Sequence, residues 1–303
     1  MAAPATAEAI RDVNTRYHDD AASSYDAKWG IDFGPGGLEQ VMGKLGKILP
    51  RDVWPAGDAL EVGAGTGYFS LNLALAGQVR STTCTDISPG MIDVLSGNAA
   101  RIGVDVEAVA CDAEALPFDD GSFDLVLGHA VLHHLPDLDR AFSEFFRVLR
   151  PGGWVAFCGE PSRLGDRLAG VPKRAAWQTA PAWRRLMRAT EAVHPGQHGD
   201  AEPGLEHVVD VHAFAPDELE RHARAGGFTG PVRVRGEELL ASWFGWANRA
   251  LEATAEPDSV PWAWKQYAYR GYLLLQQVDR RVLEGRLPPA IFYNLMVAAQ
   301  RTI

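Results

Sequence analysis

A glycine-rich segment contains the residue types and spacing best suited to ligand binding. Residues 59–68 read Ala-Leu-Glu-Val-Gly-Ala-Gly-Thr-Gly-Tyr, so glycines occupy the alternate positions 63, 65 and 67. An apolar run precedes them and an apolar helical pattern follows, which predicts a strand, a tight turn and a helix. Glycine allows positive φ and close approach of the backbone to a ligand, and a helix N-terminus offers free N–H groups. The segment indicates a nucleotide-like ligand, although some turns of this kind serve only packing.

Acidic residues follow at the ends of the next predicted strands. Asp86 ends the second strand, and its carboxylate has two acceptor oxygens for two ribose hydroxyls. Asp112 follows the third strand and can accept a hydrogen bond from an adenine amino group, while Ala113 offers its backbone N–H to a ring nitrogen. Glu61 comes just before the first glycine. Together these residues predict an adenosyl site.

Histidines after the fourth predicted strand are candidates for proton transfer. Imidazole titrates near neutral pH, so His129 and His133 are candidate bases, and Glu160 after the fifth strand is another. For His134 we favour packing in a turn that opens the next helix, beside the substrate pocket. Packing is also the alternative for His133, and Glu160 could instead cap the residues that follow it.

The elements that position these residues alternate between strand and helix patterns from residue 58 to about 161. After the glycine segment, strands are expected at 79–85, 104–110, 123–128 and 154–158, with helices at 88–101 and 138–149. Arg150-Pro151-Gly152-Gly153 is expected to end the second of these helices. Repeated βα units with apolar strands predict a doubly wound α/β fold with a parallel sheet, whose ligands bind at the C-terminal ends of the strands.

The flanking regions complete the predicted organisation. Residues 1–50 form a helical lid segment, with a glycine-rich break at 34–37 before a helix at 38–49, and residues 51–161 form the core. Residues 162–235 provide a cap with helical pieces around 177–193, a helix from 216 and a sixth strand at 232–235. Residues 236–288 are an aromatic helical insertion, and residues 289–303 provide a last strand at 290–299.

Tryptophans gather in the C-terminal half of the chain. Trp243 shares one helical face with other large apolar residues and Trp246 lies in the same helical pattern, while Trp264 and Trp177 lie in other helical patterns. Such a stripe is most often core. Because apolar walls also line small-molecule sites, we expect these four tryptophans to shape a pocket for a hydrophobic or aromatic acceptor.

The ordered series of motifs from the glycine segment to Arg150-Pro151-Gly152-Gly153 resembles the class I S-adenosylmethionine (SAM)-dependent methyltransferases, most closely the ubiquinone and menaquinone type, over residues 15–160. The resemblance implies a Rossmann-like seven-stranded sheet with an antiparallel last strand, SAM as cofactor and S-adenosylhomocysteine as product. A nicotinamide fold would space its glycines Gly-x-Gly-x-x-Gly, but position 68 is Tyr, and the intact motifs argue against a degenerate, non-binding copy. The implied cofactor residues are Glu61, Gly63, Ala64, Gly65, Gly67, Asp86, Ile87, Met91, Asp112, Ala113 and His129, with Tyr17 and Tyr25 in a segment folded across the cofactor.

The expected function is therefore SN2 transfer of a methyl group to an O, N or C atom of a small metabolite (EC 2.1.1). Two alternatives stay open. One is a nucleic-acid methyltransferase that uses basic residues between Arg163 and Arg185, and the other is a SAM-binding protein without turnover.

Composition restricts the partners. Lys and Arg number 29 against 39 Asp and Glu, a net charge of −10, so we expect no general attraction to nucleic acid. The sequence shows no signal peptide and no apolar run of about 20 residues, and its three cysteines predict reduced thiols in a cytoplasmic protein without a membrane partner. A homodimer is left open.

A histidine-rich stretch could suggest a metal site. Pro and Gly residues break up the segment that contains His194, His198, His207 and His212, so no metal is expected.

Overall fold

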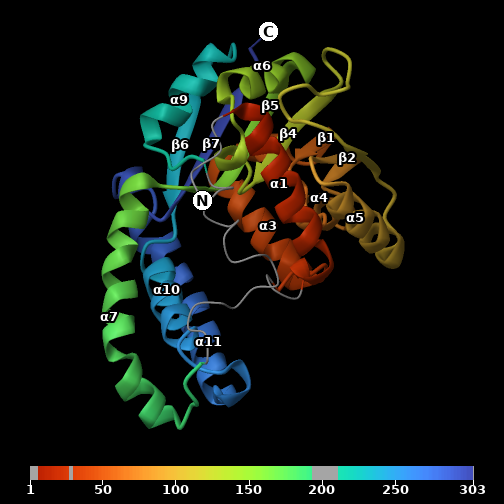
Figure 1. The fold of residues 1–303 in the computed structure, drawn as a ribbon. Coiled ribbons are helices and arrows are strands. Elements are labelled where there is room, and N and C mark those ends of the chain that lie inside the picture. The colour runs from red at the N-terminus through yellow and green to blue at the C-terminus, as the bar shows by residue number, and fades with distance from the viewer. Residues whose placement is uncertain (1–5, 27–29, 193–210, 303) are drawn as a thin grey trace. The chain divides into compact units, whose positions relative to one another are not determined.

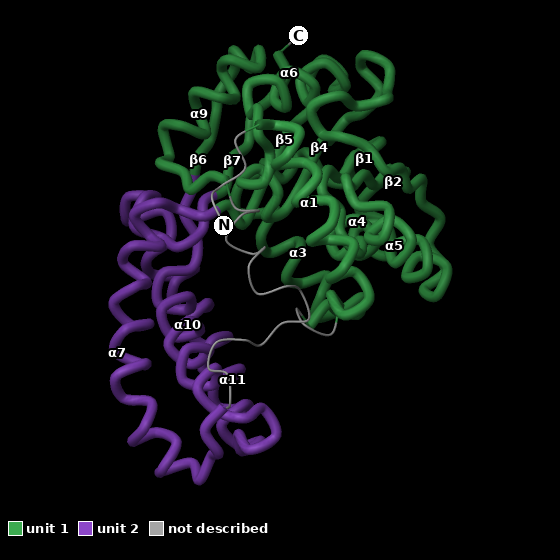
Figure 2. The backbone as a smooth tube through the Cα atoms, in the orientation of Figure 1, with its two compact units in different colours: residues 1–160, 200–234, 296–303 green, residues 161–199, 235–295 purple. Residues whose placement is uncertain are grey.

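The computed structural model describes residues 6–26, 30–192 and 211–302. Contacts between residues divide the chain into two compact units (Figure 2). Unit 1 comprises Met1–Glu160, Asp200–Val234 and Met296–Ile303, and unit 2 comprises Pro161–Gly199 and Arg235–Leu295. Each unit is therefore assembled from segments that are distant in the sequence.

A seven-stranded sheet forms the frame of the molecule, with the strand order β3-β2-β1-β4-β5-β7-β6 (Figure 1). β1 pairs in parallel with β2 and β4, β2 with β3, and β4 with β5. Near the start of β5, Gly152 and Gly153 exchange backbone hydrogen bonds with Arg301, which follows the end of β7, so β7 is antiparallel. The predicted fold class is confirmed. The strands are β1 Ala56–Val62, β2 Val79–Asp86, β3 Glu107–Ala110, β4 Phe123–His129, β5 Leu149–Pro161, β6 Val232–Glu237 and β7 Asn294–Gln300.

The helices of unit 1 begin and end at residues with clear capping roles. Ser88 caps α5, because its hydroxyl oxygen accepts the N–H of Met91 at 3.0 Å, and Pro89 occupies the first turn, as predicted. Asp137 caps α6 by accepting the N–H of Arg140 at 3.1 Å. These helices and short 3₁₀ turns are α1 Ala7–Ala21, η1 Ala22–Ser24, α3 Pro35–Ile48, η2 Arg51–Val53, α4 Tyr68–Leu75, α5 Pro89–Ile102, η3 Leu132–His134, α6 Leu138–Val148 and α9 Pro216–Ala225.

One buried core lies between the sheet and the helices of unit 1. Val41 and Leu45 of α3 and Phe69 of α4 pack against Leu125 of β4 and Met296 of β7, and all five side chains are at most 1% exposed. Burial of such side chains stabilises the fold by roughly 2 kcal/mol each. The strands of the sheet thus rest on a closely packed apolar core.

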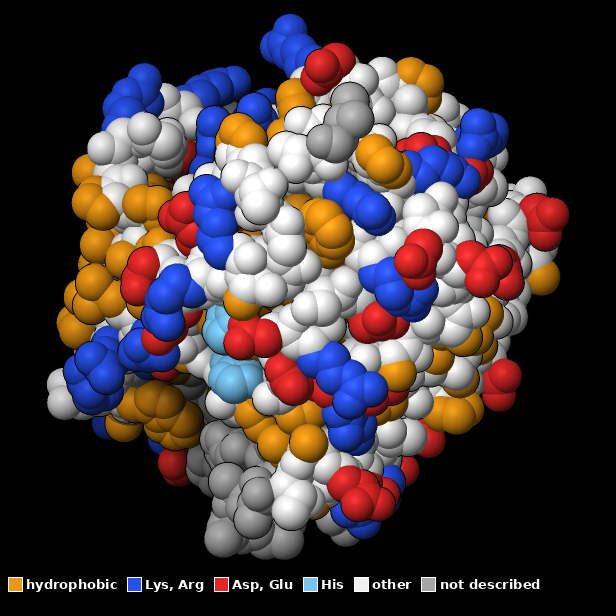
Figure 3. Space-filling view, turned by 90° about the horizontal axis from the view of Figure 1, so that it is seen from above, with side chains coloured by type: hydrophobic (Ala, Val, Ile, Leu, Met, Phe, Trp, Pro, Cys, Tyr) orange, Lys and Arg blue, Asp and Glu red, His pale blue; other side chains and the backbone are white. Residues whose placement is uncertain are grey.

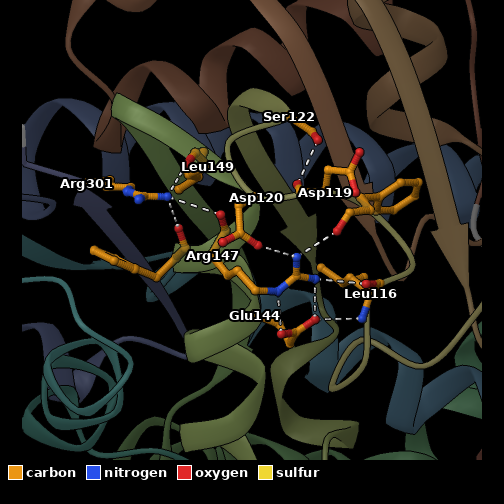
Figure 4. Close-up of polar contacts among 10 residues, drawn as sticks. Leu116, Asp119, Asp120, Ser122, Glu144, Arg147, Leu149 and Arg301 are labelled. Atoms are coloured by element: carbon orange, nitrogen blue, oxygen red, sulfur yellow. Dashed lines mark hydrogen bonds and ion pairs between the residues drawn. The ribbon is translucent and has the colours of Figure 1, made fainter.

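An arginine ties the β3–β4 connection to α6 (Figure 4). The guanidinium of Arg147 donates to the carbonyls of Leu116 at 2.9 Å and Phe118 at 2.7 Å, and it forms ion pairs with Glu144 and Asp120 at 2.8 and 2.9 Å. Because one side chain satisfies two carbonyls and two carboxylates, this connection is held in one conformation. Asp112 and Ala113 lie at the start of the same connection.

Unit 2 is helical. Its α10 packs against both α7 and α11, and the Asp279 carboxylate accepts the N–H groups of Leu240 and Ala241 at 3.0 and 2.9 Å, which fixes the start of α10. In the part of the chain that the structure describes, no helix is long and apolar enough to cross a membrane. The elements are α7 Arg163–Met187, α10 Leu240–Glu252, η4 Pro257–Ser259, α11 Trp262–Val278, a π turn at Asp279–Leu283 and η6 Pro289–Ile291.

The helical pieces expected around residues 177–193 are part of a longer helix that begins at residue 163. α7 is a single 25-residue helix that contains Pro172 and Pro181, although proline removes a backbone donor and usually ends a helix. The hydroxyl of Ser162 caps it by accepting the N–H of Gly165 at 3.2 Å and donating to the carbonyl of Ala290 at 2.7 Å. Tertiary packing has overridden local propensity here.

Four further boundaries differ from the prediction. Arg150-Pro151-Gly152-Gly153 does not separate a helix from a strand but lies inside β5, because Gly152 and Gly153 pair with Arg301. α3 begins at Pro35 rather than Leu38, with the carboxylate of Asp32 accepting the N–H groups of the two glycines at 34 and 37. β3 begins at residue 107 and β7 at residue 294, each later than expected.

Candidate functional site

A cavity lies at the C-terminal ends of the parallel strands in unit 1. It spans about 730 Å³ when the open solvent at its mouth is included. Its walls come from the turn after β1, the ends of β2, β3 and β4, and the helix α1. The residues that line it are Arg11, Asn14, His18, Tyr25, Val62, Gly63, Gly65, Thr85, Asp86, Ile87, Met91, Cys111, Asp112, Ala113, His129, Ala130, Val131, His134, Leu135 and Pro136.

The glycine turn requires its glycines for two different reasons. Gly63, Gly65 and Gly67 have φ values of 62°, 53° and 95°, a region that side chains disfavour. A Cβ on Gly63 would lie 2.3 Å from Cγ2 of Val131, whereas at Gly65 the nearest atom would be 3.9 Å away in the ring of Tyr25. Gly63 thus permits tight packing inside the cavity wall, and Gly65 leaves open space in front of the backbone.

The Asp86 carboxylate is held by the protein while its oxygens retain acceptor capacity. Oδ2 accepts the N–H of Gly65 and Oδ1 accepts the N–H of Ser88, both at 2.9 Å, and the residue is 8% exposed. Each carboxylate oxygen has a second lone pair, so two further donors can be bound. This geometry suits a vicinal diol such as that of ribose.

Three predicted cofactor residues, Glu61, Ala64 and Gly67, are not among the residues that line the cavity. Glu61 is buried, and its carboxylate accepts the N–H of Ser70 at 2.8 Å, in the first turn of α4. Burial, with a smaller contribution from the charge of Asp86, raises the pKa of Glu61 to about 7. Ala64 is also buried, and Gly67 forms the N-cap of α4. These residues support the turn rather than line the cavity.

The helix α1 closes one wall of the cavity. Its Arg11 pairs with Asp112, Nε to Oδ2 at 2.8 Å, and also with the buried Glu114. Asp19, near the other end of α1, accepts the N–H of Gly90 at 2.9 Å and the hydroxyl of Ser88. Sequence reasoning missed Arg11, Asn14 and His18; their i, i+3, i+7 spacing on a predicted helix was the available signal.

The two predicted tyrosines lie differently. Tyr25 lines the cavity, and its burial, followed by the nearby negative charge of Asp86, raises its pKa to about 12, so the phenol stays protonated. Tyr17 is buried against His18, with ring centroids 5.2 Å apart, and is not among the lining residues. Trp29, the third aromatic residue expected in this segment, lies outside the described residues.

The predicted histidines form a layered cluster. His129 and His134 line the cavity, and the ring of His129 stacks on Phe69 with centroids 4.9 Å apart. His133 is buried beneath, with Nδ1 2.8 Å from Oε2 of Glu160 and its ring centroid 4.0 Å from that of His134. The ring of His134 also meets His18 edge-on at 5.4 Å.

Glu160 holds the loop that contains these histidines. Its Oε1 accepts the N–H groups of Val131 and Leu132 at 3.0 and 3.1 Å, and its Oε2 accepts the N–H of His133 at 3.2 Å in addition to its ring. The side chain is fully buried. Geometry therefore places Glu160 behind the cavity wall, with its acceptor sites used by the loop.

The predicted substrate-pocket tryptophans all belong to unit 2. Trp177 is 45% exposed on α7, and Trp243 lies on α10. Trp246 has Lys173 Nζ 4.0 Å from its ring centroid, a cation–π contact, and Trp264 packs on Trp183 at 5.3 Å. These contacts are internal to the helical unit.

For the predicted histidine-rich stretch, His194, His198 and His207 lie outside the described residues. His212 is described; its Nε2 lies 3.0 Å from the carbonyl oxygen of Leu135, and burial lowers its pKa. Within the described ranges, no group of three His, Cys, Asp or Glu side chains is arranged to hold a metal ion.

Comparison with known proteins agrees with this geometry. Residues 60–157 match a family model described as a methyltransferase domain. The chain is 37% identical over 147 residues to the malonyl-[acyl-carrier protein] O-methyltransferase of Geobacter sulfurreducens, covering 48% of this chain and 52% of that protein. It is 34% identical over 196 residues to the ubiquinone/menaquinone biosynthesis C-methyltransferase UbiE of Cupriavidus metallidurans, covering 58% of this chain and 75% of that one.

A structural relative supports the fold. The phosphoethanolamine N-methyltransferase 2 of Haemonchus contortus, solved with phosphomonomethylethanolamine and S-adenosylhomocysteine, superposes with a TM-score of 0.59 at 18% identity over 97% of this chain and 60% of that chain. Fold and site thus define a Rossmann-like methyltransferase. The chain belongs to the class I SAM-dependent methyltransferases. Its match spans about half the length of the Geobacter relative.

Proposed function

We propose that this chain binds SAM in the unit 1 cavity and transfers the methyl group to a small hydrophobic or aromatic metabolite. The supporting observation is the Asp86 carboxylate, held between the glycine turn and α5 with lone pairs left on both oxygens. Family membership supports the choice of SAM over other adenosyl ligands.

The lining residues fit this cofactor. Asp86 would accept the ribose hydroxyls, Gly65 gives close access to the backbone, and Ile87 and Met91 would contact the adenine. Asp112 and Ala113 lie beside them. When bound, SAM supplies a methyl group already activated by the sulfonium charge, so the residues of the chain mainly align the reactants and exclude water.

Proton removal from the acceptor is assigned to the histidine cluster. His129 and His134 line the cavity, so either ring can meet the acceptor there. The buried pair of His133 and Glu160 positions the loop below them. We therefore propose His129 and His134 as contact residues and His133 with Glu160 as positioning residues.

Calorimetric titration with SAM tests the cofactor assignment. Asp86→Ala should weaken binding by about 100-fold, since two charge-assisted hydrogen bonds are lost. Asp93→Ala, an exposed position on α5, is the matched control and should bind normally. A folded wild-type protein that does not bind SAM would overturn the proposal.

Turnover needs a separate measurement. Incubation with labelled SAM and cell extract should yield S-adenosylhomocysteine and a labelled small molecule, detected by mass spectrometry. Normal SAM binding without product in any extract would instead identify a SAM-binding protein without turnover. Label in RNA or DNA would instead identify a nucleic-acid methyltransferase. On the face in Figure 3, basic and acidic side chains are interspersed.

The acceptor preference is proposed to depend on the tryptophans of unit 2. Trp243 and Trp246 lie on α10, and the ring centroid of Trp246 is 5.5 Å from that of Tyr293. A Trp243→Ala, Trp246→Ala double variant that keeps its fold should lose affinity for a hydrophobic acceptor while SAM affinity is retained. Unchanged acceptor affinity would reject this assignment.

A further inference from the structure

Charge and exposed apolar surface are distributed unevenly between the two units. Unit 2 has 14 Lys and Arg against 9 Asp and Glu, a net charge of +5, which leaves unit 1 with 15 against 30, a net charge of −15. Of the 11 large hydrophobic side chains that are exposed among the described residues, 10 belong to unit 2. A unit that is both basic and apolar on its surface is suited to binding an anionic, partly apolar partner.

The helix α7 presents the charge as a row. Arg163, Arg167, Arg174 and Arg185 are exposed, and at 100° per residue they fall within about 40° of rotation around the helix, spread over roughly 33 Å. Within the described ranges, no carboxylate pairs with Arg167, Arg174 or Arg185. The row thus forms a line of positive charge along one side of α7.

An apolar row runs beside the arginines. Leu164, Val171 and Leu186 are 42%, 58% and 74% exposed, and they lie roughly 80° further around the same helix. The side of α7 that packs within unit 2 is a different one. It consists of Gly165, Ala169, Ala176, Ala180 and Trp183, all buried.

We propose that α7 is an interfacial helix that binds unit 2 to the surface of an anionic lipid bilayer. A helix lying in the membrane surface places arginines at the lipid phosphates and aliphatic side chains at the boundary with the acyl chains. Arginine stems also tolerate this boundary while their charged ends reach the phosphates. No spanning helix is needed for this mode of binding.

Other occupants of this face fit the side chains less well. Nucleic acid would use the arginines but would leave the three aliphatic side chains against a phosphate backbone. An identical copy packed face to face would bring two arginine rows together, which like-charge repulsion disfavours. The bilayer surface accounts for both rows at once.

Vesicle co-sedimentation of the full chain tests the proposal. Binding should be strong to phosphatidylcholine vesicles with about 30 mol% phosphatidylglycerol and weak to phosphatidylcholine alone. The Arg167→Gln, Arg174→Gln, Arg185→Gln variant should bind about 100-fold more weakly, at about fivefold for each charge removed. The matched control Arg16→Gln, Arg51→Gln, Arg221→Gln removes three exposed arginines of unit 1 and should bind like the wild type.

The apolar row needs its own variant. Leu164→Ser, Val171→Ser, Leu186→Ser should abolish the vesicle binding that persists at about 0.5 M salt, where charge attraction is screened. Far-UV circular dichroism establishes that each variant keeps its helices. Two vesicle results would overturn the proposal: equal binding to both vesicle types, or a loss of vesicle binding in the arginine control as large as in the arginine variant. Two other results would also overturn it. One is binding to a single-stranded RNA oligonucleotide but not to vesicles, and the other is a dimer in sedimentation that becomes a monomer in the serine variant.

Discussion

Asp86 illustrates how single residues prepare this site before any ligand arrives. Its carboxylate accepts the backbone N–H groups of Gly65 and Ser88, so its orientation is fixed by the fold. A ligand that uses the remaining lone pairs need not immobilise a free side chain, which saves roughly 1 kcal/mol of ordering entropy. The nearby Glu61 and Glu160 are likewise committed to backbone donors.

Glu61 predicts a specific dependence of stability on pH. Because burial raises its pKa from 4.5 to about 7, the folded state holds this proton more tightly than the unfolded state. The resulting stabilisation is complete below pH 4.5 and is lost as the pH rises through 7. We therefore expect the free energy of unfolding of the wild type, measured with urea, to fall by on the order of 3 kcal/mol relative to that of Glu61→Gln as the pH rises across this window. The exposed control Glu39→Gln should track the wild type throughout.

Even the conservative substitution Glu160→Gln should lower the stability of the protein and alter its pH–rate profile. In Glu160→Gln, one oxygen can still serve Val131 and Leu132, but the amide N–H₂ group would face the N–H of His133. We expect the free energy of unfolding to fall by about 2 kcal/mol and the pH–rate profile to shift as the histidine loop moves. Asp93→Asn at an exposed site should change neither quantity. An unaltered pH–rate profile would contradict a positioning role for Glu160.

At the scale of elements, α1 is the part of the cavity wall that the sequence motifs do not predict. Glycine turns and strand-end acids have recognisable spacing, but the pairing of Arg11 with Asp112 joins residues about 100 positions apart. The same applies to β5, where Gly152 and Gly153 pair with Arg301, and to α7, which continues through two prolines. The sequence predicts elements and strand ends well because local patterns determine them, whereas these three features depend on distant partners.

Arg11→Met tests whether α1 holds the cavity closed. The substitution keeps the apolar stem but removes the pairs with Asp112 and Glu114. S-adenosylhomocysteine should bind roughly tenfold more weakly, mainly through faster dissociation in stopped-flow measurements. Arg16→Met is the matched control, because Arg16 lies on the same helix and forms an exposed ion pair with Asp12, away from Asp112 and Glu114. Equal dissociation rates for the two variants would show that α1 is not a retaining wall.

At the scale of the whole molecule, the two units contain different surface features. Unit 1 contains every residue that lines the cavity, while unit 2 contains the exposed tryptophans and the arginine row. In α11 of unit 2 no residue is buried, in contrast to the strands β1 and β4 of unit 1. Local stability follows buried contacts, so the two units should differ in how readily they open.

Hydrogen exchange measures this difference directly. Amides of β1 and β4 should exchange slowest and those of α11 much faster. Addition of S-adenosylhomocysteine should slow exchange in the glycine turn and at residues 86–91 and 111–113, and leave α11 unchanged. Ligand protection that is confined to α10 and α11 would place the binding site elsewhere.

The position of β7 has a consequence for synthesis of the protein. β7 is the last of these seven strands in chain order, yet it lies inside the sheet, between β5 and β6. Until it emerges, nascent β5 and β6 each expose an edge of unpaired backbone groups, the kind of surface at which unfinished chains associate. Translation must therefore run almost to residue 300 before the sheet is complete, and a chaperone that shields those two edges would aid this chain more than one whose last strand is peripheral.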